Sequence, residues 1–218
     1  MKNRLHILFA CVILITFVSM GCGNNIKTSP DTDVSTSDKN FTSTNGMPLL
    51  ETDLQQLYAD AQDIYLKIVF GSFNCDTTKK IEKDNFTYYK VDEPNYESFE
   101  SFKSYLANYF TEDFINREIL SPDSIRFLKA ENGDLYMMDA SRGANIFYAG
   151  HIFHESMDNE NQITFTATAY YSNTQEAYVG ELFYAEPPNP QDFSTQDFTF
   201  AMVKEGDFWK FDQFACFF

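Results

Sequence analysis

Apolar residues between positions 49 and 70 recur at steps of three and four, which is the spacing of one helix face. The residues on this face are Leu50, Leu54, Leu57, Ala61, Ile64 and Ile68, with Tyr58 and Tyr65 widening the stripe. Gly71 follows directly and is a typical helix end. The spacing therefore predicts one amphipathic helix over residues 49–70.

Two shorter helices are predicted between residues 94 and 120. Pro94 opens the second helix, whose apolar face consists of Phe99, Phe102, Leu106 and Tyr109. Thr111-Glu112-Asp113 has the polar cap and acidic first turn of a third helix, which ends before Ser121-Pro122. The alternation in Phe86–Val91 predicts a strand, and the polar stretch before it, which includes Cys75, is interpreted as a loop.

From Ile125 onward the period changes to two residues, which indicates six or seven antiparallel strands. The predicted breaks are Asn132-Gly133, Arg142-Gly143, Asp158–Asn161, Asn173-Thr174, Pro187–Pro190 and Glu205-Gly206-Asp207. Helices followed by a strand meander indicate an α+β fold, with N-terminal helices packed on one bent antiparallel sheet. Cystatin-like and nuclear-transport-factor-like folds have this element order. The final hairpin, residues 198–203 with 208–217, is expected to complete the same sheet.

The first 21 residues have the pattern of a signal peptide. Lys2 and Arg4 precede an apolar run from Ile7 to Met20, and the run ends at Gly21-Cys22. A small residue before cysteine is typical of bacterial lipoprotein signals. We therefore expect cleavage before Cys22, lipidation of its thiol, and attachment to the outer face of the cell membrane.

Residues 22–46 are rich in Asn, Ser, Thr, Asp and Lys, which predicts a disordered tether followed by a single domain over residues 47–218. The chain has 16 basic and 32 acidic residues. Without Lys2 and Arg4 its formal charge becomes 14 − 32 = −18. The longest basic cluster is Lys79-Lys80, so nucleic acid is not an expected partner.

The two remaining thiols, Cys75 and Cys216, have two interpretations. An exported pair can form a disulfide, or both can be small buried side chains. The context Phe214–Phe217 favours the interior of a strand for Cys216.

His151 and His154 are the most conspicuous candidate metal ligands, with Glu155 beside them. Because the surrounding run indicates a strand, residues three apart point to opposite faces, and no shared metal is expected. No activated nucleophile, phosphate loop or cysteine array is recognisable, so neither an enzyme nor a cofactor is expected.

The stretch Phe127–Gly143 runs as a strand, an Asn-Gly turn, a strand with Leu-Tyr, and a short loop that ends in Arg-Gly. Further matching segments are Tyr105-Leu106, Tyr109–Thr111, Val203-Lys204 and Phe208–Lys210. Together these features resemble the bacterial inhibitors of peptidoglycan DL-endopeptidases, exported proteins of Gram-positive organisms that restrain cell-wall autolysins of the cysteine-peptidase class.

The resemblance implies helices that back a bent sheet and a loop that enters the active-site cleft of an NlpC-type peptidase. By position, this inhibitory loop is Asp139, Ala140, Ser141, Arg142 and Gly143. Ala140 and Ser141 replace expected glycines and make the loop stiffer. The acidic charge suits capture of a basic enzyme.

Three other interpretations remain open. The loop can be a plain connection in which Arg142 donates to nearby carboxylates. With 37 aromatic residues, 23 Phe, 13 Tyr and 1 Trp, the space between helices and sheet can form an aromatic pocket for a small molecule. The third interpretation is a purely structural or assembly lipoprotein, a role that no sequence motif would reveal.

Overall fold

The long helix α1 (Thr52–Phe70) forms where the spacing of apolar residues predicts it. It ends because Gly71 adopts a left-handed conformation, with φ 65°, and its backbone N–H donates to the Lys67 carbonyl. Tyr58, Ala61, Ile64 and Ile68 are buried on one face. The predicted amphipathic helix is therefore confirmed.

The computed structural model describes residues 45–140 and 142–218, which lie in one compact unit. The other helical elements are α2 (Phe99–Leu106), α3 (Glu112–Phe114), the π-helix η1 (Ile115–Ile119) and the 3₁₀ helix η2 (Pro190–Asp192). Side chains of Ser98 and Ser101 form a capping box, so α2 starts at Phe99 and not at Pro94. Thr111 Oγ1 accepts the Phe114 N–H and caps α3, as its sequence predicts.

Four strands form the first sheet. They are β1 (Cys75–Lys83), β2 (Phe86–Val91), β3 (Phe127–Lys129) and β4 (Leu135–Met138), in the antiparallel order β1-β2-β4-β3. β2 was predicted with these bounds, whereas the loop interpretation of the preceding segment is wrong. β1 is a mostly exposed edge strand, so its polar side chains face solvent and no apolar alternation marks it.

The second sheet contains the longest strands. They are β5 (Tyr148–Phe153), β6 (Met157–Asn159), β7 (Gln162–Ser172), β8 (Phe193–Glu205) and β9 (Phe208–Gln213). The order is β5-β7-β8-β9, and β6 pairs with the start of β7. All pairings are antiparallel.

The fold class α+β is confirmed, but the expectation of one bent sheet is wrong, because the strands form two sheets. β2 pairs with β4, and the chain then leaves the first sheet after Met138 and starts the second at Tyr148. The final hairpin does join the β5-β7-β8 sheet, but its last strand ends at Gln213. Residues 214–218 are not a strand.

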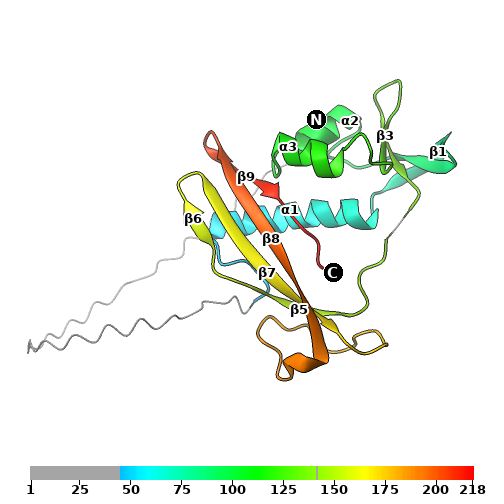
Figure 1. Ribbon diagram of the computed structural model, residues 1–218. Helices are drawn as coiled ribbons and strands as arrows, with labels where there is room; N and C mark the ends of the chain where they lie inside the picture. The colour runs from blue at the N-terminus through cyan, green and yellow to red at the C-terminus, as the bar shows by residue number, and fades with distance from the viewer. Residues whose placement is uncertain (1–44, 141) are drawn as a thin grey trace, which may run out of the picture. The chain divides into compact units, whose positions relative to one another are not determined.

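Both sheets and α1 share one hydrophobic core. Figure 1 shows the long helix α1 running past both sheets. The Tyr58 ring contacts aromatic rings from β5, β7, β8 and β9, with the Phe153 ring centroid 5.5 Å away. The segment after β9 turns back toward α1, where the Phe214 ring lies 5.2 Å from Tyr65. This return positions residues 214–218 between the helix and the second sheet.

Candidate functional site

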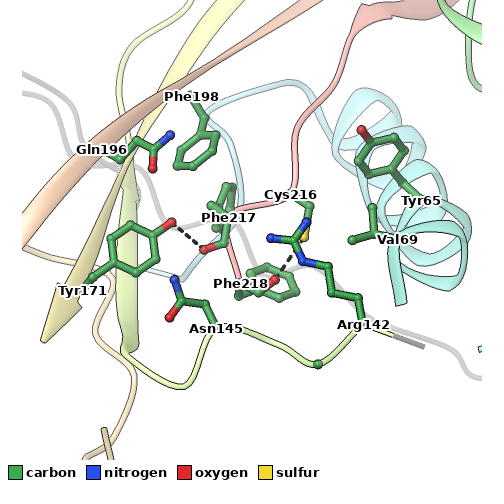
Figure 2. Close-up of a pocket in the computed structure, with 11 residues that line it drawn as sticks. Tyr65, Val69, Arg142, Asn145, Tyr171, Gln196, Phe198, Cys216, Phe217 and Phe218 are labelled. Carbon is green, nitrogen blue, oxygen red and sulfur yellow. Dashed lines mark hydrogen bonds between the residues drawn. The ribbon is translucent and has the colours of Figure 1, made fainter. Parts of the chain in front are cut away.

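A cavity of about 420 Å³ opens between α1, the second sheet and the C-terminal segment 214–218 (Figure 2). Tyr65 and Val69 line it from α1, Tyr171 from β7 and Phe198 from β8. Arg142, Gly143 and Asn145, which follow the first sheet, line it on another side. We call this cavity the aromatic pocket.

The C-terminal segment is held in place by hydrogen bonds and ring contacts. Tyr171 Oη donates to the Phe217 carbonyl at 2.7 Å, and Cys216 Sγ donates to the Phe218 carbonyl at 3.1 Å (Figure 2). Phe217 is 3% exposed, and its ring lies 4.5 Å from that of His151. The segment is therefore a fixed wall of the pocket.

The phenol and thiol groups that line the pocket are uncharged at neutral pH. Burial raises the pKa of Tyr65 and of Tyr171 to about 12. Burial likewise raises the pKa of the Cys216 thiol. Arg142 is the one charged side chain among the residues that line this pocket in the described structure.

Cys75 and Cys216 are free, half-buried thiols. Cys75 opens β1 and does not lie in a loop, and Cys216 lies beyond β9 and not inside a strand. Burial and the nearby Glu93 carboxylate raise the pKa of Cys75 to about 11. Neither thiol is an activated nucleophile, because the reactive species is the thiolate.

His151 and His154 make separate contacts. His151 is 5% exposed on β5, where Tyr148 Oη lies 2.5 Å from its Nδ1 and the Gly46 carbonyl lies 3.1 Å from its Nε2. His154 is half-buried just after β5, with its Nε2 2.7 Å from Thr168 Oγ1. Residues 45–140 and 142–218 contain no group of three or more His, Cys, Asp or Glu side chains arranged for a metal ion.

His151 is expected to make folding stability fall as pH drops. Burial lowers its pKa from 6.5 to about 4, while the hydrogen bond to Gly46 opposes this shift. The unfolded chain therefore binds the proton first, so stability is full above pH 6.5 and declines toward pH 4, by on the order of 3 kcal/mol.

Urea unfolding of the wild type and of His151→Gln between pH 7.5 and 4 measures this contribution. The difference at pH 7.5 gives the cost of the substitution itself, and that difference should shrink as pH falls. Parallel pH profiles for the two proteins would contradict the buried, neutral histidine.

The segment predicted as an inhibitory loop connects the two sheets. The Asp139 N–H donates to the Thr87 carbonyl on β2 at 2.8 Å, and the Arg142 N–H donates to the Phe70 carbonyl at the end of α1 at 3.3 Å. Asp139 is exposed, Ala140 is half-buried, and Arg142 and Gly143 are exposed. Ser141 and the predicted lipidation site Cys22 lie outside the described residues, as do the signal peptide and residues 22–44 of the tether.

Gly46, the last residue of the predicted tether, contacts the domain. Its carbonyl faces His151, and a Cβ at this position would lie 2.6 Å from the Tyr184 ring. No described helix is long and apolar enough to cross a membrane.

The sequence left an aromatic pocket open as an alternative and did not indicate its residues. Phe217 was interpreted as a strand residue, Phe218 was given no element, and Tyr171 had no distinguishing pattern. Two adjacent phenylalanines after a strand that ends in polar Gln213 were the available signal for a buried return segment.

Comparison with known proteins finds no family model that matches the chain and no curated protein with significant similarity to it.

Proposed function

We propose that this protein is an exported, lipid-anchored inhibitor of NlpC-type cell-wall DL-endopeptidases, and that it acts by binding and not by catalysis. Its anchor is the lipid on Cys22, and its inhibitory loop is the segment from Asp139 to Gly143. We also propose that the fold is of the cystatin-like or nuclear-transport-factor-like type. The packing of α1 across the strands of the second sheet supports this.

The observation that carries the proposal is the way the chain between β4 and β5 is held. We call its described residues, 139–140 and 142–147, the connecting segment. Besides the bonds of Asp139 and Arg142 to β2 and α1, the Ile146 carbonyl accepts the Tyr178 N–H at 2.8 Å. Between these attachments the side chains of residues 142–146 are exposed, with Ile146 60% exposed. A short exposed segment fixed at both ends loses little conformational entropy when it docks.

Charge supports the same kind of partner. A mature chain with a formal charge of −18, from 14 basic and 32 acidic residues, attracts a basic enzyme over long range. Binding to a basic peptidase should therefore weaken as ionic strength rises.

The test is inhibition of an NlpC-type endopeptidase from the same organism in a cell-wall clearing assay, with a soluble form that starts after Cys22. The decisive variant is Gly143→Phe, because an added Cβ at this position meets nothing within 4 Å and φ is not positive there. We expect Gly143→Phe to leave the fold intact and to weaken inhibition at least about tenfold, through steric exclusion from a narrow cleft.

Asn161→Phe is the matched control. Asn161 is exposed in the turn before β7. The connecting segment lies at the other end of β7, where the Ser172 N–H donates to the Phe147 carbonyl, so Asn161 is far from the proposed contact. Failure of the wild type to inhibit any such peptidase would end the proposal. Equal inhibition by Gly143→Phe and the wild type would mean that the segment is only a connection.

The aromatic pocket favours a second function, the binding of a small molecule. Its volume of about 420 Å³ lies within the range of known ligand sites, roughly 300–1,000 Å³. Ring faces from three elements line it, with Asn145 and Gln196 as polar groups. If this function is correct, Gly143→Phe should weaken binding of the small molecule more than Asn161→Phe does, in the absence of any peptidase.

A further inference from the structure

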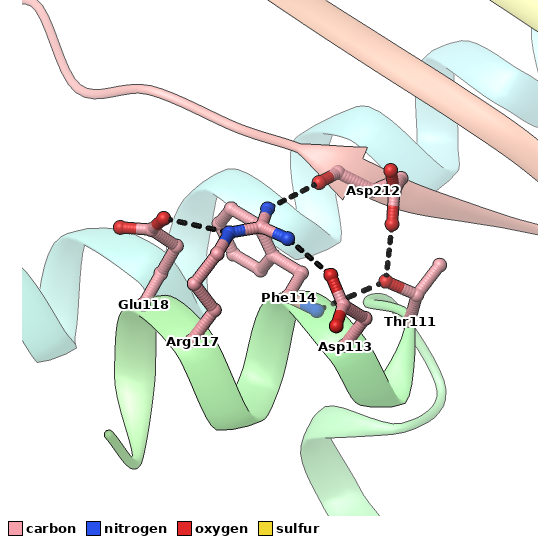
Figure 3. Close-up of polar contacts among 6 residues, drawn as sticks. All are labelled: Thr111, Asp113, Phe114, Arg117, Glu118 and Asp212. Atoms are coloured by element: carbon pink, nitrogen blue, oxygen red, sulfur yellow. Dashed lines mark hydrogen bonds and ion pairs between the residues drawn. The ribbon is translucent and has the colours of Figure 1, made fainter. Parts of the chain in front are cut away.

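Two of the three arginines in the described part of the chain lack a partner for their guanidinium groups. The third, Arg117, has partners on several sides (Figure 3). It contacts the Asp113 carboxylate, donates from Nε to Glu118 at 2.9 Å, and donates from Nη2 to the Asp212 carbonyl at 3.2 Å. Each of the three guanidinium nitrogens of Arg117 therefore has an acceptor.

Arg126 and Arg142 make no side-chain hydrogen bond or ion pair with any residue in 45–140 or 142–218. Nη1 of Arg126 is buried and has no acceptor, the one such side-chain atom in the described structure. In a chain with 32 acidic residues, counter-charges are plentiful, so the lack of any at both arginines needs an explanation.

Both arginines line one small cavity of about 160 Å³. Tyr65, Val69 and Arg142 line this cavity and also the aromatic pocket, so the two spaces adjoin each other beside the last turns of α1. Ser124 adds a hydroxyl to the small cavity. A ligand can thus extend from the arginines into the aromatic pocket.

The electrostatics of the small cavity favour an anion. Burial, and second the positive charge of Arg142, lower the pKa of Arg126, so the charged form of Arg126 is destabilised in this cavity. The C-terminal end of α1 offsets part of this cost, since its carbonyl dipoles attract cations. Glu118 is the one acid that lines the cavity, and its carboxylate is already bound by Arg117.

We propose that Arg126 and Arg142 bind the carboxylate or phosphate group of a small organic anion, whose apolar part occupies the aromatic pocket. Guanidinium groups match the geometry of these oxyanions and bind them through paired N–H donors. A bound oxyanion supplies the acceptors that the two arginines lack and removes the repulsion between them. The site does not depend on inhibition of a peptidase.

The test uses isothermal titration of the mature chain, without any enzyme, with three probes at neutral pH and low salt. They are 3-phenylpropionate, its neutral amide, and inorganic phosphate. We expect 3-phenylpropionate to bind at least about tenfold more tightly than the amide, because the amide cannot form charge-assisted hydrogen bonds. We also expect it to bind more tightly than phosphate, which lacks a group for the aromatic pocket.

Arg126→Gln and Arg142→Gln should each weaken 3-phenylpropionate binding about tenfold or more. Lys80→Gln removes the same charge at an exposed, paired site outside both cavities, where Lys80 Nζ lies 3.0 Å from Glu82 Oε1, and should leave the affinity within about twofold. Arg142 is exposed, so Arg142→Gln keeps the test valid if Arg126→Gln fails to fold, which circular dichroism decides.

Equal binding of the acid and the amide would overturn the proposal. So would an equal loss of affinity in Lys80→Gln and Arg142→Gln, because that result would indicate the general field of the protein. If inorganic phosphate binds as tightly as 3-phenylpropionate, the aromatic pocket contributes nothing to binding and that part of the proposal is wrong. No binding of any probe at millimolar concentration would refute the site altogether.

Discussion

Replacing Tyr58 by Ala is expected to lower the free energy of unfolding by about 4 kcal/mol, the middle of the range for a buried aromatic side chain. Tyr58 is 0% exposed, and its ring contacts Phe153, Phe165, Phe200 and Phe211 from four strands. Truncation leaves a cavity where α1 meets the whole second sheet. The surrounding rings are themselves packed against one another and cannot collapse to fill it.

Urea unfolding followed by circular dichroism measures this loss, and Tyr58→Phe is the control. The control keeps the ring and removes only the hydroxyl, which accepts a hydrogen bond from Gln62 Nε2 at 3.0 Å. We expect the control to cost about 1 kcal/mol. A similar loss in both variants would show that the hydroxyl, and not the packing of the ring, dominates.

Gly150→Ala is expected to destabilise the protein by about 3 kcal/mol or more, although it adds only one methyl group. Gly150 lies in β5 with φ 146°, and a Cβ there would lie 2.0 Å from the Phe183 carbonyl oxygen. That carbonyl accepts the His151 N–H, and the Phe183 N–H donates to Ala149, both at 3.1 Å. The obstacle is hydrogen-bonded backbone, which cannot move aside as a side chain can.

Gly143→Ala is the matched control, because it makes the same change where no atom lies within 4 Å. Its stability should differ from wild type by no more than about 0.5 kcal/mol. Thermal unfolding of the two variants side by side gives the comparison. Gly150→Ala with a wild-type melting temperature would mean that the Phe183 segment is loosely held against β5.

The local elements of this fold could be predicted because their signals are local. The spacing of apolar residues defines α1, Thr111 marks the start of α3, and turn residues separate β8 from β9. β1 was missed because an exposed edge strand needs no apolar alternation. Its hairpin signal, Asp84-Asn85 with positive φ at both residues, consists of two polar residues within a polar stretch.

The pairing of strands could not be predicted in the same way. A two-residue period indicates which residues form strands but not which strands are neighbours. The break predicted at Arg142-Gly143 therefore does not show that the chain passes from the first sheet to the second there.

The candidate sites are harder still to predict, because their residues come from distant segments. Tyr65, Arg142 and Phe217 line one pocket only after α1, the connecting segment and the C-terminal segment have been brought together. The missing acceptor of Arg126 is equally invisible, since the sequence offers many carboxylates and does not show that none is near.

The return of the C-terminal segment to α1 has a consequence for the order of folding. α1 is synthesised long before the Phe211 and Phe214 rings that cover Tyr58. Other contacts also span much of the chain, such as Thr111 with Asp212, 101 residues apart, and His151 with Gly46, 105 residues apart. Such contacts raise the contact order and slow folding. The emerging chain therefore exposes an apolar helix face until its final strand appears, and in that interval a holding chaperone would have its binding site.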